Sequence, residues 1–170
     1  YDLNTKYYKE LTMYIIAGKK KLAKVREGEL EELIRSVGLY NSKAKNIRRC
    51  CRTLVDEFGG EIPEAMEDLL RLGGVGRKVA NLIRGDVFGL GGIVADTHCI
   101  RITNKLGLAS SKDPVKVERQ LEVLVPRQRQ TDFCHRLVHF GRDCCIARAP
   151  RCDACVLADC CDACQKGESA

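Results

Sequence analysis

The sequence predicts an all-α protein, and three observations support this prediction. Apolar residues recur every three to four positions along most of the chain, as they do on one face of an amphipathic helix. The alternating pattern typical of strands is nearly absent. Residues that start or stop helices stand between the periodic segments. A chain of 170 residues has room for one compact domain, or for two small lobes that share a core.

The first predicted helix carries the apolar residues Leu30, Leu33, Ile34 and Val37, and the second, after Asn41-Ser42, carries Ile47, Cys51, Leu54, Val55 and Phe58. In each of them the apolar residues fall on one face, which predicts that this face packs against a core. Gly38 is a stop signal for the first helix, and Asn41-Ser42 is a start signal for the second.

A third helix is expected after Pro63, since proline is favoured in the first turn of a helix, and it runs to about Leu72. The run Gly73-Gly74-Val75-Gly76 then breaks the helical pattern. A fourth helix is expected over residues 77–88. Together these segments predict a helical hairpin over residues 63–88.

Three more helices complete the predicted set. Asp96-Thr97 caps the fifth, which ends near Gly107. Pro114 opens the sixth. The seventh covers about residues 131–141, and the cysteine-rich tail that follows has no regular pattern.

Charge and hydropathy narrow the class of protein. The chain carries 29 basic and 23 acidic residues, a net charge of +6, which favours a polyanionic partner only mildly. Basic residues gather at Lys19-Lys20-Lys21 and along residues 43–52, where they either bind phosphates or form a solvated helix surface. No apolar run is long enough to span a bilayer, and no signal peptide is visible.

Cysteine is unusually frequent, and its distribution is uneven. Seven of the 11 cysteines fall between residues 144 and 164, whereas a disulfide framework spreads its cysteines to close long loops. The clustering therefore indicates a metal or cluster site. Four of these cysteines have the spacing C-x6-C-x2-C-x5-C, namely Cys145, Cys152, Cys155 and Cys161. Four thiolates on a short loop hold either zinc or an iron–sulfur cluster, and the spacing alone leaves both open.

The glycine turn at residues 73–76 is a candidate anion site. It leads directly into a helix N-terminus, where free N–H groups and the helix dipole favour a phosphate. The alternative is a tight corner between two helices that binds no ligand. Arg77 and Lys78 follow the turn at once, which favours DNA as the ligand.

Lys78 and Asp96 are the candidate catalytic residues. A neutral lysine amine is a nucleophile that forms Schiff bases, although an exposed lysine at this position more simply binds a phosphate. Asp96 either only caps its helix or also faces Lys78 across a cleft, and sequence spacing does not decide between these.

The motifs in combination resemble the helix–hairpin–helix DNA glycosylases of the endonuclease III type. The run Gly74-Val75-Gly76-Arg77-Lys78 is followed, eighteen residues after Lys78, by the acid of Ala95-Asp96-Thr97-His98. The four-cysteine spacing is that family's 4Fe–4S loop. Two further runs fit the same pattern, Leu39-Tyr40-Asn41-Ser42-Lys43-Ala44 and His139-Phe140-Gly141-Arg142.

The resemblance implies a function and a set of site residues. Lys78 would attack C1′ of a flipped-out damaged nucleotide, and Asp96 would deprotonate the lysine or stabilise the sugar cation. β-Elimination through the Schiff base would then nick the strand, with oxidised pyrimidines as the usual substrates. The 4Fe–4S cluster would have a structural and DNA-docking role. The DNA-binding residues implied are Leu39 (as a wedge), Gly74, Gly76, Arg77, His98, Arg101, Arg148 and Arg151.

The resemblance also implies an organisation. One helical lobe would cover residues 1–105, and residues 106–170 would hold the other helices and the cluster loop, 145–161. The family has a further N-terminal stretch, so the chain is expected to be N-terminally truncated at Tyr1. The expected partner is damaged or abasic double-stranded DNA, bound by a monomer. The expected location is inside the cell, in a prokaryotic cytoplasm or nucleoid, or in a eukaryotic nucleus or mitochondrion.

Besides the missing N-terminal stretch, one residue departs from the family pattern, because Gly73 stands where the family usually has proline. Cys144, Cys160 and Cys164 are extra cysteines, which are either inert or make the ligand register ambiguous. Two alternative functions accompany this interpretation. The first alternative is a non-catalytic module that docks on duplex DNA, which would need no Lys78 or Asp96. The second is an interaction protein stabilised by zinc, which iron content would distinguish.

Overall fold

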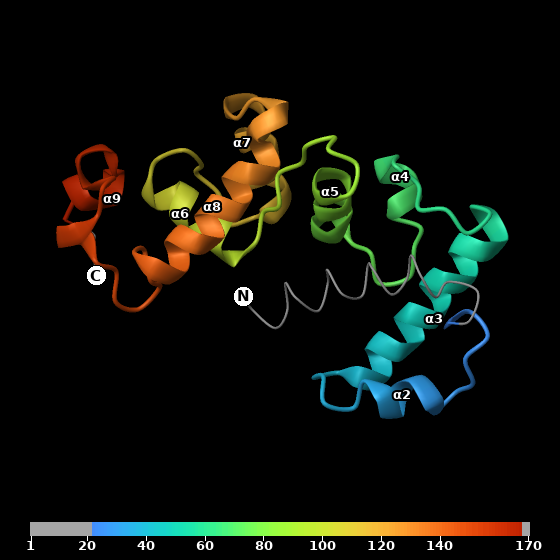
Figure 1. Ribbon diagram of the computed structural model, residues 1–170. Helices are drawn as coiled ribbons and strands as arrows, with labels where there is room; N and C mark the ends of the chain where they lie inside the picture. The colour runs from blue at the N-terminus through green and yellow to red at the C-terminus, as the bar shows by residue number, and fades with distance from the viewer. Residues whose placement is uncertain (1–21, 168–170) are drawn as a thin grey trace. The chain divides into compact units, whose positions relative to one another are not determined.

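The computed structural model describes residues 22–167 and contains only helices, turns and loops over that range (Figure 1). The prediction of an all-α fold is therefore confirmed for the described residues. The chain divides into two compact units, one ending at Ala80 and the other beginning at Asn81. Within residues 22–167, no helix is both long enough and apolar enough to cross a membrane.

The first unit is built on α3 (Tyr40–Glu57), with the short helices α2 (Glu29–Leu33) and α4 (Met66–Leu69) before and after it. One face of α3 is apolar, and it packs against α2 and the chain that precedes α2. The buried core there consists of Leu30, Ala44, Ile47 and Cys51.

Two arginines link the elements of this unit. Arg48 on α3 donates two hydrogen bonds of 2.8 and 2.7 Å to the carboxylate of Glu31 on α2. Arg71, just after α4, pairs with Glu57 at the end of α3 and lies 5.2 Å from the ring centre of Phe58. These pairs hold α2 against the middle of α3 and the turn after α4 against its C-terminal end.

The second unit packs α6 (Thr97–Lys105), α7 (Pro114–Leu124) and α8 (Gln130–Asp143) around one core. α5 (Arg77–Asp86) begins in the first unit and ends in the second. A single 3₁₀ turn, η1 (Arg127–Arg129), precedes α8. The core residues are Ile93, Ala95, Cys99, Ile102, Ala109, Val117, Leu121, Cys134 and Leu137.

Aspartate caps start two of these helices, and the sequence predicts the one at Asp96. Asp96 Oδ1 accepts from the backbone N–H of Cys99 at 2.7 Å, and Asp113 Oδ1 accepts from that of Lys116 at 2.9 Å. Pro114 is the first residue of α7. Each cap satisfies an N–H group that has no partner inside its helix.

The structure differs from the sequence prediction at several boundaries. α2 ends at Leu33 rather than Val37, and α4 begins at Met66, because the chain after Pro63 stays extended through Ala65. The cysteine-rich tail does contain helical turns, namely η2 (Cys152–Ala154), η3 (Ala158–Cys160) and α9 (Asp162–Gln165).

The division into units also differs from the boundary that the sequence suggests at 105–106. The apolar residues of α6 pack with those of α7 and α8, so this helix belongs to the second unit. The basic run at Lys19-Lys20-Lys21 and the expected truncation at Tyr1 lie outside the described residues.

Candidate functional site

The turn between α4 and α5 packs tightly against α3. A Cβ atom on Gly73 would lie 2.7 Å from the backbone oxygen of Asn46 and 2.9 Å from the Arg49 side chain. Gly74 has φ +78°, and a Cβ there would lie 2.9 Å from Cβ of Asn46. By contrast, a Cβ on Gly76 would meet nothing within 4 Å. The first two glycines therefore allow close packing, whereas Gly76 keeps the entrance to α5 open.

Lys78 lies in the first turn of α5, and its side chain is exposed. The first N–H groups of any helix have no intrahelical partner, and they carry the positive end of the helix dipole. An exposed amine, an open glycine and a helix N-terminus are thus neighbours in the chain. Together they form a surface that is suited to an anion.

Asp96 lies in the second unit as the N-cap of α6, and it is partly buried. Its Oδ1 atom is held by the Cys99 N–H, and its own N–H donates to the Val94 oxygen at 2.8 Å. The carboxylate therefore has a fixed position at the start of a helix. Lys78 belongs to the first unit and Asp96 to the second.

Leu39 combines two unfavourable features. It is the N-cap of α3, with a left-handed backbone of φ 59° and ψ 34°, the only described non-glycine residue with positive φ. Its side chain is 82% exposed. A left-handed leucine costs roughly 1–2 kcal/mol, and an exposed leucine gains nothing from burial. Such strain at an exposed apolar residue is a reason to expect a function there.

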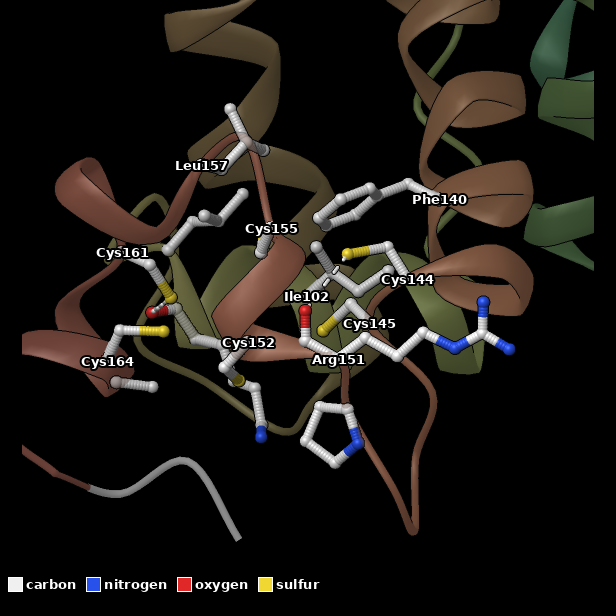
Figure 2. Close-up of a pocket in the computed structure, with 14 residues that line it drawn as sticks. Ile102, Phe140, Cys144, Cys145, Arg151, Cys152, Cys155, Leu157, Cys161 and Cys164 are labelled. Carbon is white, nitrogen blue, oxygen red and sulfur yellow. Dashed lines mark hydrogen bonds between the residues drawn. The ribbon is translucent and has the colours of Figure 1, made fainter.

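A pocket in the second unit is lined by six cysteines (Figure 2). In that view the sulfurs of Cys161 and Cys164 lie on one side and those of Cys144 and Cys145 on the other. Ile102, Leu106, Phe140 and Leu157 supply an apolar wall. The cysteines that line the pocket are Cys144, Cys145, Cys152, Cys155, Cys161 and Cys164.

The donor set of this pocket fits a 4Fe–4S cluster. Within residues 22–167, no three His, Cys, Asp or Glu side chains gather closely enough to hold a single metal ion. A cluster instead binds one thiolate at each of several irons, so its ligands stand around a volume. Thiols spread around an apolar pocket have this arrangement, and the four cysteines with the predicted spacing are all among them.

Arg101 connects this pocket to the start of α6. Its Nη1 atom donates to the backbone oxygen of Cys145 at 2.6 Å and lies 3.4 Å from the Cys145 sulfur. Its Nη2 atom lies 3.3 Å from Nδ1 of His98. The guanidinium, which the family resemblance puts among the DNA contacts, is thus directed to groups within the protein.

The other candidate DNA contacts differ in exposure. Arg148 and Arg151 are exposed in the first interval between cysteines, and the Arg151 N–H donates to the Cys144 oxygen at 2.9 Å. Arg77 and His98 are partly buried. The two exposed arginines are therefore free of the core and accessible to a phosphate.

Three residues that help to build the site were not among the predicted site residues. Asn81 is buried, and its Nδ2 atom donates to the Ile93 oxygen at 2.8 Å, which joins α5 to the strand-like segment before Asp96. Nothing in the sequence around Asn81 predicts that its side chain would bind the Ile93 oxygen. Cys144 and Cys164, named above only as extra cysteines, also line the pocket. The vicinal pair Cys144-Cys145 was the available signal for Cys144.

Comparison with known proteins gives consistent matches. Residues 3–127 match the HhH-GPD superfamily of base excision DNA repair proteins. Endonuclease III of Synechocystis sp. is 45% identical over 138 residues, which is 81% of this chain and 63% of that protein. Endonuclease III of Haemophilus influenzae is 45% identical over 139 residues, 82% of this chain and 66% of that protein. The chain thus spans slightly less than two thirds of the length of these relatives.

A solved structure supports the same relationship. A trapped endonuclease III–DNA covalent intermediate superimposes with a TM-score of 0.83 and 35% sequence identity, covering 94% of this chain and 76% of that one. The family model, the curated relatives and the fold agree with the motifs at the glycine turn and the cysteine loop. This chain therefore belongs to the endonuclease III family, within the HhH-GPD superfamily of base excision DNA repair proteins.

Proposed function

We propose that the protein is a base-excision repair DNA glycosylase with an AP lyase activity, and that oxidised pyrimidines are its substrates. The observation that carries the proposal is the exposed Lys78 in the first turn of α5, directly after the glycine turn. A module that only docks on DNA needs the backbone amides of this turn but not the amine. The related endonuclease III trapped as a covalent intermediate with DNA supports a covalent step here as well.

The proposed reaction begins at the sugar of the damaged nucleotide. Nζ of the neutral Lys78 attacks C1′, the C1′–N bond breaks, and the base leaves with the bonding electrons and takes up a proton. Asp96 accepts a proton from the amine or stabilises the positive charge that develops on the sugar. The sugar ring then opens to give a protonated Schiff base between Nζ and C1′.

The lyase step follows from this Schiff base. Removal of a proton from C2′ sends electrons toward the iminium, and the C3′–O bond breaks, so the strand is nicked 3′ to the lesion. Water then hydrolyses the imine and releases Lys78 for another turnover.

Each proposed DNA contact follows from the chemical group that the residue presents, which is a backbone N–H, a positive charge or an apolar side chain. Gly74, Gly76 and Arg77 place backbone N–H groups and a positive charge at the α5 N-terminus, where a phosphate would bind. Leu39 fills the space left by the flipped nucleotide. Arg148 and Arg151 contact the backbone from the cysteine loop. His98 lies beside the Asp96 cap, and Arg101 supports the loop through Cys145.

The residues that would hold a 4Fe–4S cluster are Cys145, Cys152, Cys155 and Cys161. When bound, the cluster supplies four iron–thiolate bonds that fix the loop. Arg101 keeps the Cys145 backbone in place, and Phe140 and Leu157 keep water from one wall of the pocket. The loop thereby presents Arg148 and Arg151 to DNA. A protein with this activity would act in the compartment that holds the DNA, which is the cytoplasm or nucleoid of a prokaryote, or the nucleus or mitochondrion of a eukaryote.

Borohydride trapping tests the proposal. The chain is incubated with a duplex that carries either thymine glycol or an abasic site, and covalent adducts are quantified after reduction. We expect an adduct with the parent chain and a loss of about a hundredfold or more in Lys78→Ala. Lys116→Ala, which removes an exposed lysine from α7, is the matched control and should trap like the parent.

Two outcomes would contradict parts of this proposal. An iron-loaded chain that binds the duplex but forms no adduct would exclude the lyase and favour a docking module. An adduct with the abasic duplex but none with thymine glycol would exclude the proposed glycosylase substrate while retaining the lyase.

A further inference from the structure

Cys144 lies directly before the candidate ligand Cys145 and lines the same pocket. It is the C-cap of α8, and its backbone N–H donates to the Phe140 oxygen at 3.0 Å. The C-terminal end of α8 therefore fixes the position of the Cys144 backbone. Figure 2 shows the Cys144 and Cys145 sulfurs on the same side of the pocket.

The Cys144 thiol faces the other candidate ligands. Its side chain lines the pocket together with those of Cys145, Cys152 and Cys155. Its sulfur also donates to the Arg151 oxygen over 3.7 Å, a long and weak hydrogen bond. Little would be lost if this thiol left its present partner for a metal.

The extra cysteine of the second vicinal pair in the tail is placed differently. Cys160 also precedes a candidate ligand, Cys161, but it is exposed, and its sulfur donates to the Leu157 oxygen at 3.4 Å. It does not line the pocket. Adjacency in the sequence is therefore common to both pairs, whereas access to the pocket distinguishes Cys144.

We propose that Cys144 is a reserve ligand of the cluster, able to replace Cys145 when that thiolate is lost. This inference rests on the 4Fe–4S cluster proposed above. In the exchange, the Cys144 thiol gives its proton to solvent and forms the iron–sulfur bond that Cys145 no longer makes. Arg101 holds the Cys145 backbone oxygen at 2.6 Å, so the loop keeps its course while the ligand changes.

Iron and sulfide content of purified, reconstituted variants tests the proposal. We expect Cys145→Ser to keep at least about half of the parent's iron, and Cys144→Ser to keep nearly all of it. The double variant C144S/C145S should fall to about a tenth or less. Cys152→Ser, whose neighbours are Arg151 and Asp153, should fall as far as the double variant, and Cys160→Ser should match the parent.

A second experiment measures how fast the Cys144 thiol is alkylated. The folded, iron-loaded Cys145→Ser chain is alkylated, digested and analysed by mass spectrometry, with circular dichroism to check that it is helical. Cys144 should be protected until a chelator removes the iron, and then react at least about tenfold faster. In the iron-loaded parent, where Cys145 is the ligand, Cys144 should react faster than in the iron-loaded Cys145→Ser chain.

The outcomes separate this inference from the cluster itself. If the parent binds iron but Cys145→Ser loses it as fully as the double variant, there is no reserve ligand. If Cys144→Ser loses iron while Cys145→Ser does not, Cys144 is the primary ligand and the assignment is reversed. A parent that takes up no iron overturns the cluster proposal, and this one with it.

Discussion

At the scale of single residues, Leu39 shows a conflict between stability and function that can be measured. Its left-handed backbone costs the folded state roughly 1–2 kcal/mol, and a glycine at this position would remove that strain. Glycine also raises the entropy of the unfolded chain, which offsets about 0.4–1 kcal/mol of this gain in stability. We expect Leu39→Gly to raise the free energy of unfolding by about 0.5–1 kcal/mol in urea. The same change should weaken binding to lesion-containing duplex.

An exposed leucine elsewhere in the first unit supplies the control. Leu33 is 75% exposed, but it lies in helical conformation at the end of α2. Leu33→Ala should leave the dissociation constant for the duplex within about twofold of the parent, while Leu39→Ala raises it several-fold. Equal effects of the two changes would refute a specific role for Leu39.

Asp96 allows capping to be separated from catalysis. Asparagine caps helices about as well as aspartate, so Asp96→Asn should retain the bond to the Cys99 N–H and change the melting temperature little. The loss of the carboxylate charge should lower the rate of base release by about 10²–10⁴-fold in single turnover. A slow variant that also melts much earlier than the parent would point to a structural role only.

These residues also show what the sequence could predict. The cap at Asp96 was predictable, because Asp-Thr before an apolar helix is a local signal. The strain at Leu39 was not, because nothing in Gly38-Leu39-Tyr40 requires a left-handed leucine rather than a left-handed glycine. That conformation depends on how α3 is placed by its own core.

At the scale of elements, the α4–α5 turn makes opposite predictions for two glycines. A methyl group at Gly73 would collide with the backbone of α3, and overpacking typically costs about 1–3 kcal/mol. Gly76 has open space and no positive φ, so alanine there should be neutral or stabilise by up to about 1 kcal/mol. Urea unfolding of Gly73→Ala and Gly76→Ala measures both. A Gly73→Ala chain as stable as the parent would show that α3 and the turn are less tightly packed.

The contact between α2 and α3 should depend on pH. Hydrogen bonds from Arg48 lower the pKa of Glu31 from 4.5 to about 2. The folded state thus binds a proton less readily than the unfolded state, so this pair stabilises the fold above about pH 4.5, and its contribution is lost as pH falls toward 2. Glu31→Gln should flatten the fall in unfolding free energy between about pH 5 and pH 2. Glu32→Gln on the same helix is the control, and a curve for Glu31→Gln that matches it would refute the prediction.

At the scale of the whole molecule, the sequence predicted the helices better than their grouping. Periodicity and caps place α3, α5, α6, α7 and α8 because those signals are local. The division at Ala80–Asn81 depends on the side chains of α6 packing with those of α7 and α8, which are remote in sequence. For the same reason, the spacing of four cysteines was visible in the sequence, whereas the place of Cys144 beside them in the pocket was not.

If the proposed 4Fe–4S cluster is bound, the second unit should respond unevenly to its loss. The core of this unit includes Leu121 of α7 and Leu137 of α8, neither of which lines the cysteine pocket. In the loop, η2 and η3 bury no residue, and the thiol hydrogen bonds are 3.4–3.7 Å long. Segments with so few buried contacts open easily unless something else fixes them. We therefore expect removal of iron by a chelator to destabilise the loop and to spare the helices.

Hydrogen exchange read by mass spectrometry measures this for each segment. Amides of residues 144–165 should exchange at least about tenfold faster after chelation, while those of α3, α6 and α8 keep their protection. Loss of protection throughout α6 and α8 would show that the cluster stabilises the whole second unit. A loop that stays protected without iron would show that its own contacts fix it. The exposed Arg148 and Arg151 would then need no cluster to be held in position for DNA.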